Sequence, residues 1–170
     1  MFSLSDRAYT ELDGAVIVWR WCPRPGLWFA DRPTTVAQWS AIGPEVLAEG
    51  HTPLVRKSAE EIDAWVLRLR RDEPTAHLPT EEEWYKAACA DHTTDPYGPL
   101  DEIAVYSLTA PFMTCTKKPN GWGLYDTIGL VWELTAPSKG SKGSSRVLRG
   151  GSWRDVFQVN LRASARLRND

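Results

Sequence analysis

Two helix starts constrain the fold of this chain more than any other feature. The segments SAEE (58–61) and TEEE (80–83) both match the capping box, in which a hydroxyl caps the helix and a glutamate three residues later reaches back. Apolar residues at helical spacing follow each start, so we expect helices over 58–71 and 80–90. Twelve Gly and twelve Pro interrupt the rest of the chain, and nine Trp offer large aromatic bodies to cover a loop-rich core.

Short strands and one further helix are expected outside these two helices. The run AVIVWRW (15–21) is β-branched and aromatic, which is typical of a strand, and Leu27–Phe29 resumes pairing after a proline-rich turn. Residues 34–42 have helical spacing, with Thr34 or Thr35 as the cap. Residues 140–145 predict a flexible loop, and the last strand begins at Val147–Leu148.

Length and composition indicate one soluble domain. The chain has 170 residues, 42% of them hydrophobic and 25% charged, without an internal repeat. No apolar stretch approaches the roughly 20 residues that span a bilayer. The N-terminal residues lack the basic and apolar regions of a signal peptide, so a cytoplasmic or phage-borne protein without membrane insertion is expected. The three widely spaced cysteines predict reduced, mostly buried thiols rather than a zinc site.

The net charge of −2 is unevenly distributed along the chain. Residues 1–138 carry 12 basic and 20 acidic side chains, whereas residues 139–170 carry 8 basic and 2 acidic ones. Such a basic segment could attract nucleic acid or an acidic partner. We favour the alternative that its arginines pair with upstream carboxylates and stack on tryptophans.

Three stretches in order carry a resemblance to a known family. They are LPTEEEWYKAACA (78–90), NGWGLYDTIGLVWELT (120–135) and RVLRGGSW (146–153). Together they resemble the formylglycine-generating-enzyme-like family, the sulfatase-modifying-factor domain, over roughly residues 15–170. The resemblance implies an α+β, C-type-lectin-like fold with two main helices, short antiparallel strands and long loops. It also implies a single domain, 1–170, that lacks the family's last strand.

The second of these stretches implies a structural calcium site. In the resembled family the matching motif holds calcium, which prefers carboxylates and backbone carbonyls. Carried over residue by residue, the ligands are the Asp126 side chain, the Gly129 and Val131 carbonyls and the Glu133 side chain. The family usually has Asn where Leu130 stands. The alternative is that Asp126 and Glu133 only hydrogen-bond the loop.

The family's enzyme chemistry is not expected in this chain. Its catalytic members use a redox-active cysteine pair just past the RGGSW motif, with a copper cofactor that suits thiolate ligands. Residues 154–170 contain neither Cys nor His, so we expect no copper and no catalytic residues. Sulfoxide-forming members need a separate helical domain with histidine ligands, and His51, His77 and His92 have no metal-binding spacing.

The segment after the Gly150–Gly151 bend is open to three interpretations: an active site, a ligand-reading surface or the last piece of the core. Leu161, Ala163 and Val159 are expected to face inward, and Arg162, Ser164 and Arg166 to form a frame. The intervening residues follow no packing pattern, and Val156–Phe157 beside charged neighbours is typical of a binding patch. The predicted ligand-binding set is Trp153, Arg154, Asp155, Val156, Phe157, Asn160, Ala165, Leu167 and Asn169.

One branch of the family resembles this segment closely. The target proteins of diversity-generating retroelements share the RGGSW lead-in and diversify the residues after it, which varies their ligand specificity. The resemblance predicts a non-catalytic domain that displays a variable C-terminal surface to an unknown protein or surface ligand. The alternatives are an enzyme of the formylglycine-generating or sulfoxide-forming type and a non-diversified subunit of a larger complex. A missing strand would leave an open sheet edge, which predicts an oligomer or a partner subunit.

Overall fold

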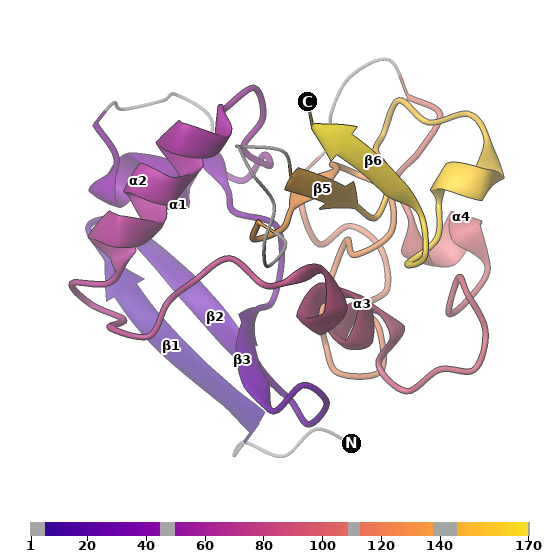
Figure 1. Ribbon diagram of the computed structural model, residues 1–170, viewed down its shortest axis with the longest axis horizontal. Coiled ribbons are helices and arrows are strands. Elements are labelled where there is room, and N and C mark those ends of the chain that lie inside the picture. Colours follow the sequence, from indigo (N-terminus) through magenta and orange to yellow (C-terminus); the bar gives the residue numbers. More distant parts are fainter. Residues whose placement is uncertain (1–5, 45–49, 109–112, 138–145, 170) are drawn as a thin grey trace.

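The chain folds into two halves, each built on a three-stranded antiparallel sheet (Figure 1). The computed structural model describes residues 6–44, 50–108, 113–137 and 146–169. The N-terminal half contains β1 (Arg7–Leu12), β2 (Ala15–Cys22), β3 (Leu27–Ala30), α1 (Val36–Ile42) and α2 (Ala59–Leu69). The C-terminal half contains α3 (Glu81–Cys89), α4 (Leu100–Ile103), β4 (Glu133–Leu134), β5 (Arg146–Arg149), the 3-10 helix η2 (Gln158–Asn160) and β6 (Arg166–Asn169).

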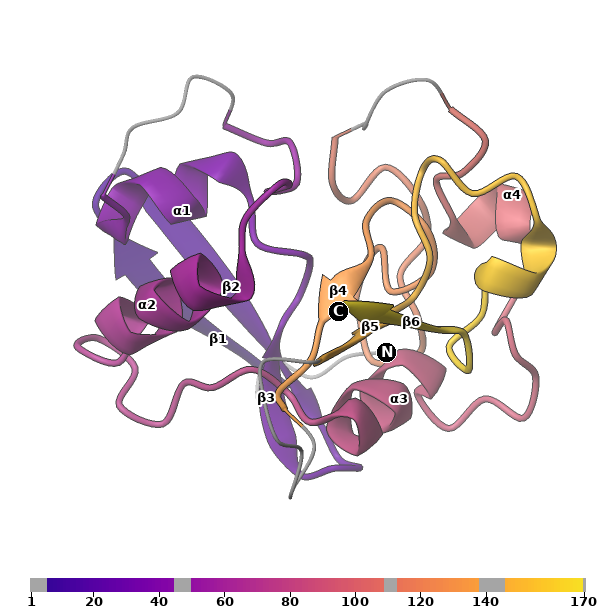
Figure 2. The same cartoon turned by 45° about the horizontal axis from the view of Figure 1, so that its top comes forward.

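Helices α1 and α2 cover one face of the β1–β2–β3 sheet, as both views show (Figures 1 and 2). Ile17 of β2 is buried there against Trp39, Trp65 and Leu69. The Trp39 and Trp65 rings stack with centroids 6.1 Å apart and an interplanar angle of 9°. These large apolar side chains form the core of the N-terminal half.

All three capped helices begin where the sequence predicts. Thr35, Ser58 and Thr80 each accept a hydrogen bond from the backbone three residues later and complete a capping box. Helix α2 ends at Leu69, before Pro74. In α3 the apolar residues Trp84, Ala87 and Ala88 are buried.

The C-terminal half is mostly loop, and its loops are fastened to α3. The Asn120 side chain donates to the carbonyls of Ala87 and Ala88, at 2.9 and 3.1 Å. Its carbonyl oxygen accepts from the backbone N–H groups of Trp122 and Leu124. One buried amide therefore holds the 120–124 turn against the C-terminal end of α3.

The structure confirms the mixed helix-and-sheet fold and corrects three details of the prediction. The last strand is β6, which pairs with β5 in the register Arg149↔Arg166 to Arg146↔Asn169, so placing the last strand at Val147–Leu148 was wrong. Strand β1 was not predicted. Val159 was expected to face inward and is 65% exposed. The expected loop at 140–145 lies outside the described residues, and no described helix is long and apolar enough to cross a membrane.

Candidate ligand-binding surface and cleft

The chain turns sharply between β5 and the C-terminal loop because two glycines allow close backbone contacts. Gly150 and Gly151 have φ values of +95° and +84°. A Cβ atom would lie 2.7 Å from the Thr127 carbonyl oxygen at Gly150 and 2.6 Å from the Asn160 carbonyl oxygen at Gly151. Only glycine fits such positions without a shift of the backbone. The paired glycines therefore bring the C-terminal loop onto the 127–131 segment.

Trp153 anchors the start of this loop to the core. Its half-buried ring packs against Val105, Leu130 and Val131. The backbone N–H of Trp153 donates to the Leu130 carbonyl at 2.9 Å, and the backbone carbonyl of Trp153 accepts from the Leu108 N–H at 2.8 Å. Trp153 was predicted as a ligand-binding residue, and its contacts in the structure attach the start of the loop to the core.

Asp155 fixes the shape of the loop from within. One carboxylate oxygen accepts from the N–H and the hydroxyl of Ser152, both at 2.8 Å. The other accepts from the Asn160 side chain at 2.7 Å. Because both oxygens have protein donors, Asp155 and Asn160, two of the predicted ligand-binding residues, hold the loop together.

Three apolar residues between Asp155 and Leu161 point outward. Val156, Phe157 and Val159 are 62%, 70% and 65% exposed. We call these three residues the C-terminal patch. Apolar side chains of this size are rarely so exposed in succession unless they contact another molecule.

A buried frame supports the C-terminal patch from below. Leu161 and Ala163, expected to face inward, are 0% and 2% exposed and pack with Trp84. The Asp95 carboxylate accepts from the N–H groups of Ala163 and Ser164 at 2.7 and 2.9 Å. This role of Asp95 has no local signal in the sequence, because its contact with Ala163 spans 68 positions along the chain.

The remaining predicted residues lie around this frame. Arg154 is exposed and stacks on Trp153, with its guanidinium carbon 5.5 Å from the ring centroid. The Ala165 carbonyl accepts from Arg149 at 2.9 Å. Leu167 is 46% exposed on β6, and the Asn169 side chain lies outside the described residues.

Several arginines of the basic C-terminal segment pair with upstream carboxylates, as we favoured from the sequence. Arg146 forms a bidentate ion pair with Asp63 of α2. Arg166 pairs with Glu81 of α3 at 2.5 Å, and Arg149 lies 3.5 Å from the same carboxylate. Arg149 also stacks over Trp84, 5.6 Å from the ring centroid. Glu81 therefore joins α3 to β5 and β6.

The predicted calcium ligands provide only part of a cation site. Asp126 is 1% exposed, and its Oδ1 atom has no hydrogen-bond partner among the described residues, which favours a cation. Its Oδ2 atom accepts from the Cys115 N–H at 2.7 Å. The Glu133 carboxylate accepts from Trp84, and the described residues contain no cluster of three or more His, Cys, Asp or Glu side chains.

Burial shifts both carboxyl groups of this predicted site in the same direction. It raises the pKa of Asp126 to about 6 and the pKa of Glu133 to about 8. Leu130, at the position of the family's Asn, is fully buried with φ +54°, a left-handed conformation that Asn adopts more readily. The calcium site stays a prediction.

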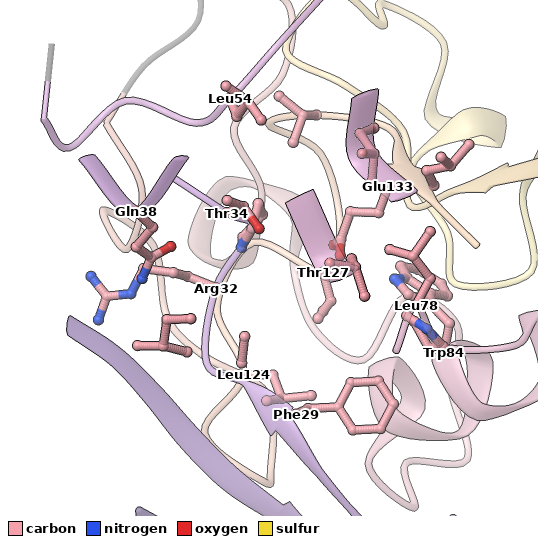
Figure 3. A pocket seen from close by; sticks show the side chains of 18 of the residues that line it. Phe29, Arg32, Thr34, Gln38, Leu54, Leu78, Trp84, Leu124, Thr127 and Glu133 are labelled. Atoms are coloured by element: carbon pink, nitrogen blue, oxygen red, sulfur yellow. The ribbon is translucent and has the colours of Figure 1, made fainter. Parts of the chain in front are cut away.

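A cleft of about 860 Å³ lies between the two halves (Figure 3). Phe29, Leu54, Leu124, Trp84 and Glu133 are among the residues that line it. This volume is within the range of sites that hold small molecules. The sequence gives no signal for such a cleft, because it forms between segments that are distant along the chain.

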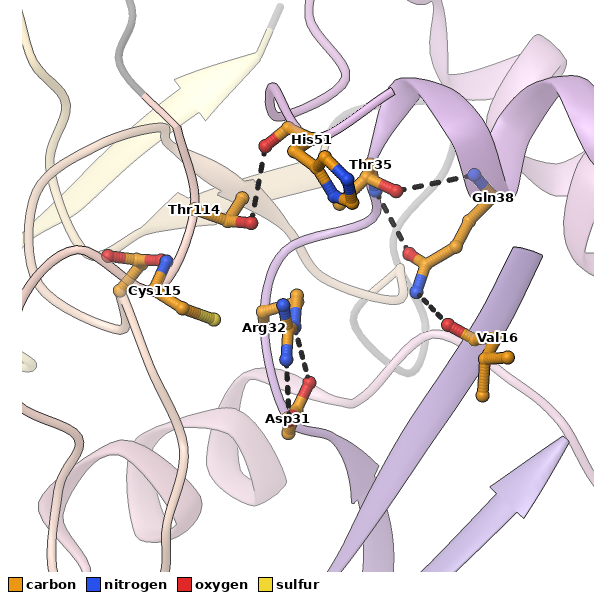
Figure 4. A network of polar contacts seen from close by, with 9 residues as sticks. Val16, Asp31, Arg32, Thr35, Gln38, His51, Thr114 and Cys115 are labelled. Atoms are coloured by element: carbon orange, nitrogen blue, oxygen red, sulfur yellow. Dashed lines mark hydrogen bonds and ion pairs between the residues drawn. The ribbon is translucent and has the colours of Figure 1, made fainter.

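Polar contacts hold the N-terminal wall of the cleft in place (Figure 4). Arg32 forms a bidentate pair with Asp31 at 2.7 and 3.0 Å. The Gln38 side chain donates to the Val16 carbonyl at 2.9 Å and accepts from the Thr35 N–H at 3.0 Å. The two halves meet where Thr114 donates to the His51 carbonyl.

The three cysteines do not form a reactive pair. Cys22, Cys89 and Cys115 are all free thiols, and Cys22 is fully buried. Burial raises the pKa of Cys22 and of Cys115 to about 12, so neither is a thiolate at neutral pH. The thiolate is the nucleophile and the metal ligand in cysteine chemistry.

Known proteins share both the fold and parts of the sequence. The structure superposes on Treponema denticola variable protein 1 with a TM-score of 0.78 and 17% identity, covering 99% of this chain and 94% of that one. It superposes on CarF with a TM-score of 0.62 and 14% identity, covering 96% and 90%. At such low sequence identity, the two superpositions show that the fold is shared and no more.

Two curated proteins match about half of the chain. Inactive C-alpha-formylglycine-generating enzyme 2 of Mus musculus is 32% identical over 111 residues, which are 53% of this chain and 35% of that protein. Serine/threonine-protein kinase pkn1 of Chlamydia caviae is 34% identical over 116 residues, 55% of this chain and 18% of the kinase. The chain thus matches about a third or less of the length of each relative.

The family relation rests on a match over most of the chain. The model of the "Sulfatase-modifying factor enzyme 1-like domain" family matches residues 29–170. This range contains the capped helix α3, the Asn120 turn and the Gly150–Gly151 bend described above. The chain belongs to the sulfatase-modifying factor enzyme 1-like domain family.

Proposed function

We propose that this chain is a non-catalytic ligand-binding domain whose C-terminal patch contacts a protein or surface ligand. The observation that carries the proposal is the contrast within one loop. Val156, Phe157 and Val159 are largely exposed, whereas Leu161 and Ala163, a few residues later, are fully buried. A rigid frame thus presents side chains that contribute little to its own packing.

The surroundings of the patch fit a binding surface. Arg154, two residues before Val156, is exposed, which gives the apolar anchors a charged neighbour. The loop is preorganised because Asp155 bonds Ser152 and Asn160. Preorganisation lowers the entropic cost of binding, which favours a recognition surface at this position.

We further propose that the exposed residues of the C-terminal patch are diversified. The fold likeness to a variable protein of Treponema denticola supports it. If the chain is the target of a diversity-generating retroelement, its gene lies beside a reverse transcriptase and a near-identical template repeat. Differences between the two copies fall at template adenines and change the codons of Val156, Phe157 and their exposed neighbours. Differences scattered evenly over frame codons such as Leu161 would refute diversification.

The proposed lack of enzyme activity is tested separately with the purified protein. We expect no conversion of a cysteine-containing sulfatase peptide to formylglycine in the presence of copper, because the thiols are dispersed and protonated. Mass spectrometry of the peptide measures the conversion. Tight copper binding together with peptide oxidation would establish the alternative, an enzyme of the formylglycine-generating type.

A further inference from the structure

A small pocket adjoins the C-terminal patch. Its volume is about 250 Å³, and it forms between the 96–106 segment and the loop that carries the patch. Helix α4 and the 3-10 helix η2, which contribute residues to it, lie next to each other in both views (Figures 1 and 2). Gln158, one of its lining residues, stands between Phe157 and Val159 of the patch. Because small-molecule sites begin at roughly 300 Å³, the pocket fits one side chain of a larger ligand.

Part of the pocket wall is apolar and attached to the core. Leu100 and Tyr106 line the pocket and pack against the buried cluster that contains Trp84. The C-terminal side is held in place as well, because the Asp95 carboxylate accepts from the Ala163 N–H at 2.7 Å. The pocket is therefore built from segments whose positions are set by the fold.

Arg162 gives this pocket a positive charge that nothing nearby neutralises. It lines the pocket and is exposed, and its guanidinium makes no hydrogen bond or ion pair with the described residues. Arg146, Arg149 and Arg166, from the same basic segment, all pair with carboxylates. Arg162 was expected to belong to the frame, and the structure leaves its side chain free for a ligand. A guanidinium offers parallel donors that match the two oxygens of a carboxylate.

The acidic groups near the pocket already have partners within the protein. The Asp101 carboxylate, which lines the pocket, accepts from the Tyr106 hydroxyl. The Lys117 ammonium donates to the Asp101 backbone carbonyl at 2.6 Å, and Glu102 pairs with Lys118 at 2.7 Å. These contacts leave the guanidinium of the pocket as the charge without a local counterpart, which favours an anionic group on the ligand.

We propose that this pocket takes an acidic side chain of a protein partner whose apolar residues cover the C-terminal patch. Arg162 binds the carboxylate, and the Gln158 side-chain amide supplies a neutral donor beside it. This inference rests on the proposed function and gives the ligand a chemical class: a protein segment with Asp or Glu next to large apolar side chains. A charge beside an apolar anchor sets the register of binding and disfavours partners with a cation at that position.

The test uses three peptides with blocked termini that differ only in the central residue: Phe-Glu-Val, Phe-Gln-Val and Phe-Lys-Val. NMR signals of the isotope-labelled protein report on two places, the Arg162 Nε–H group for the pocket and the methyl groups of Val156 and Val159 for the patch. We expect all three peptides to shift the valine methyl signals and only the glutamate peptide to shift the Arg162 signal saturably. The glutamate peptide should bind about fivefold more tightly than the glutamine peptide, as one partly exposed ion pair allows.

Variants check that this preference comes from the pocket. Arg162→Gln should abolish the preference for the glutamate peptide, whereas Arg168→Gln, which removes an exposed arginine of β6, should keep it. The comparison of the three peptides on the unaltered protein stands even where Arg162→Gln fails to fold.

The two sets of signals separate failure of this inference from failure of the proposed function. Equal affinities for the three peptides, with the valine shifts preserved, would overturn the acidic side chain and leave the patch as a binding surface. Peptides that shift no valine methyl signal would contradict the proposed function, and this inference with it.

Discussion

At the scale of single residues, Glu133 has the most informative chemistry. Its carboxylate accepts from the Trp84 indole, and burial raises its pKa from 4.5 to about 8. Because the folded protein binds this proton more tightly than the unfolded chain does, the associated stability is present below about pH 4.5. It is lost as the pH rises through about 8.

Glu133→Gln should remove this pH dependence. Between about pH 6 and pH 9 the free energy of unfolding of the unaltered protein falls. The decrease is up to about 1.4 kcal/mol for each pH unit in which the folded protein keeps the Glu133 proton and the unfolded chain does not. The variant is expected to fall less and to be the more stable of the two at the alkaline end. Urea unfolding at both pH values in EDTA measures the difference. Glu82→Gln, at an exposed position of α3, is the matched control, and equal slopes in variant and parent would contradict the assignment.

The calcium prediction is tested at the same residues. Above about pH 8 both carboxyl groups are ionised, and millimolar calcium should raise the melting temperature if the ion binds only the folded state. Asp126→Asn should abolish the increase, since it removes the buried charge. An unchanged melting temperature in the parent protein would favour the alternative, in which Asp126 and Glu133 only hydrogen-bond the loop.

At the scale of elements, the sequence predicts those that have local signals. Capping boxes place the starts of α2 and α3 at the correct residue, since the cap depends on four consecutive positions. Strand β1 was missed although Asp13–Gly14, a common hairpin turn, separates it from β2. Strand β6 was missed because its arginine-rich sequence is strand-forming only beside β5.

In the candidate site, too, features with a local sequence signal were predicted and features that depend on distant partners were not. The exposure of Val156 and Phe157 follows from the break in the packing pattern, and it was predicted. The roles of Asp95, Glu81 and Asn120 were missed, because each depends on partners more than thirty positions away. Three-dimensional pairing of this kind leaves no periodic trace in one sequence.

Asn120→Ala should loosen the turn that follows α3. The change leaves two carbonyls and two N–H groups without their partner, so we expect a loss of about 3 kcal/mol or more in the free energy of unfolding. Urea denaturation measures this loss, with the surface variant Thr116→Ala as a control expected to change stability by less than about 0.5 kcal/mol. A loss below about 1 kcal/mol would show that water replaces the amide at little cost.

At the scale of the whole molecule, the β4–β5–β6 sheet ends on β6, which is an edge in the described part of the chain. We predicted an oligomer or a partner subunit from an open edge. Arg166 and Arg168 are exposed on β6, so two copies that pair there bring like charges together. An acidic strand of a partner would fit the same edge better.

Sedimentation velocity can separate these cases. Self-association should grow with protein concentration and should be stronger in molar salt, where the repulsion between arginines is screened, than in dilute buffer. Arg168→Glu should reverse the salt dependence if β6 mediates the contact. A single monomer boundary at micromolar concentration in both buffers would count against pairing of this chain with itself.

The central claim is that a fixed frame carries a surface whose residues are free to change. Two libraries test it: one randomises Arg154, Val156, Phe157, Val159 and Leu167, and the other randomises Leu161, Ala163 and Asp95. Protease resistance of the displayed variants measures the folded fraction in each. We predict that most members of the first library fold and that few of the second do, because buried positions tolerate little change whereas exposed ones tolerate much. Equal folded fractions in the two libraries would contradict the claim.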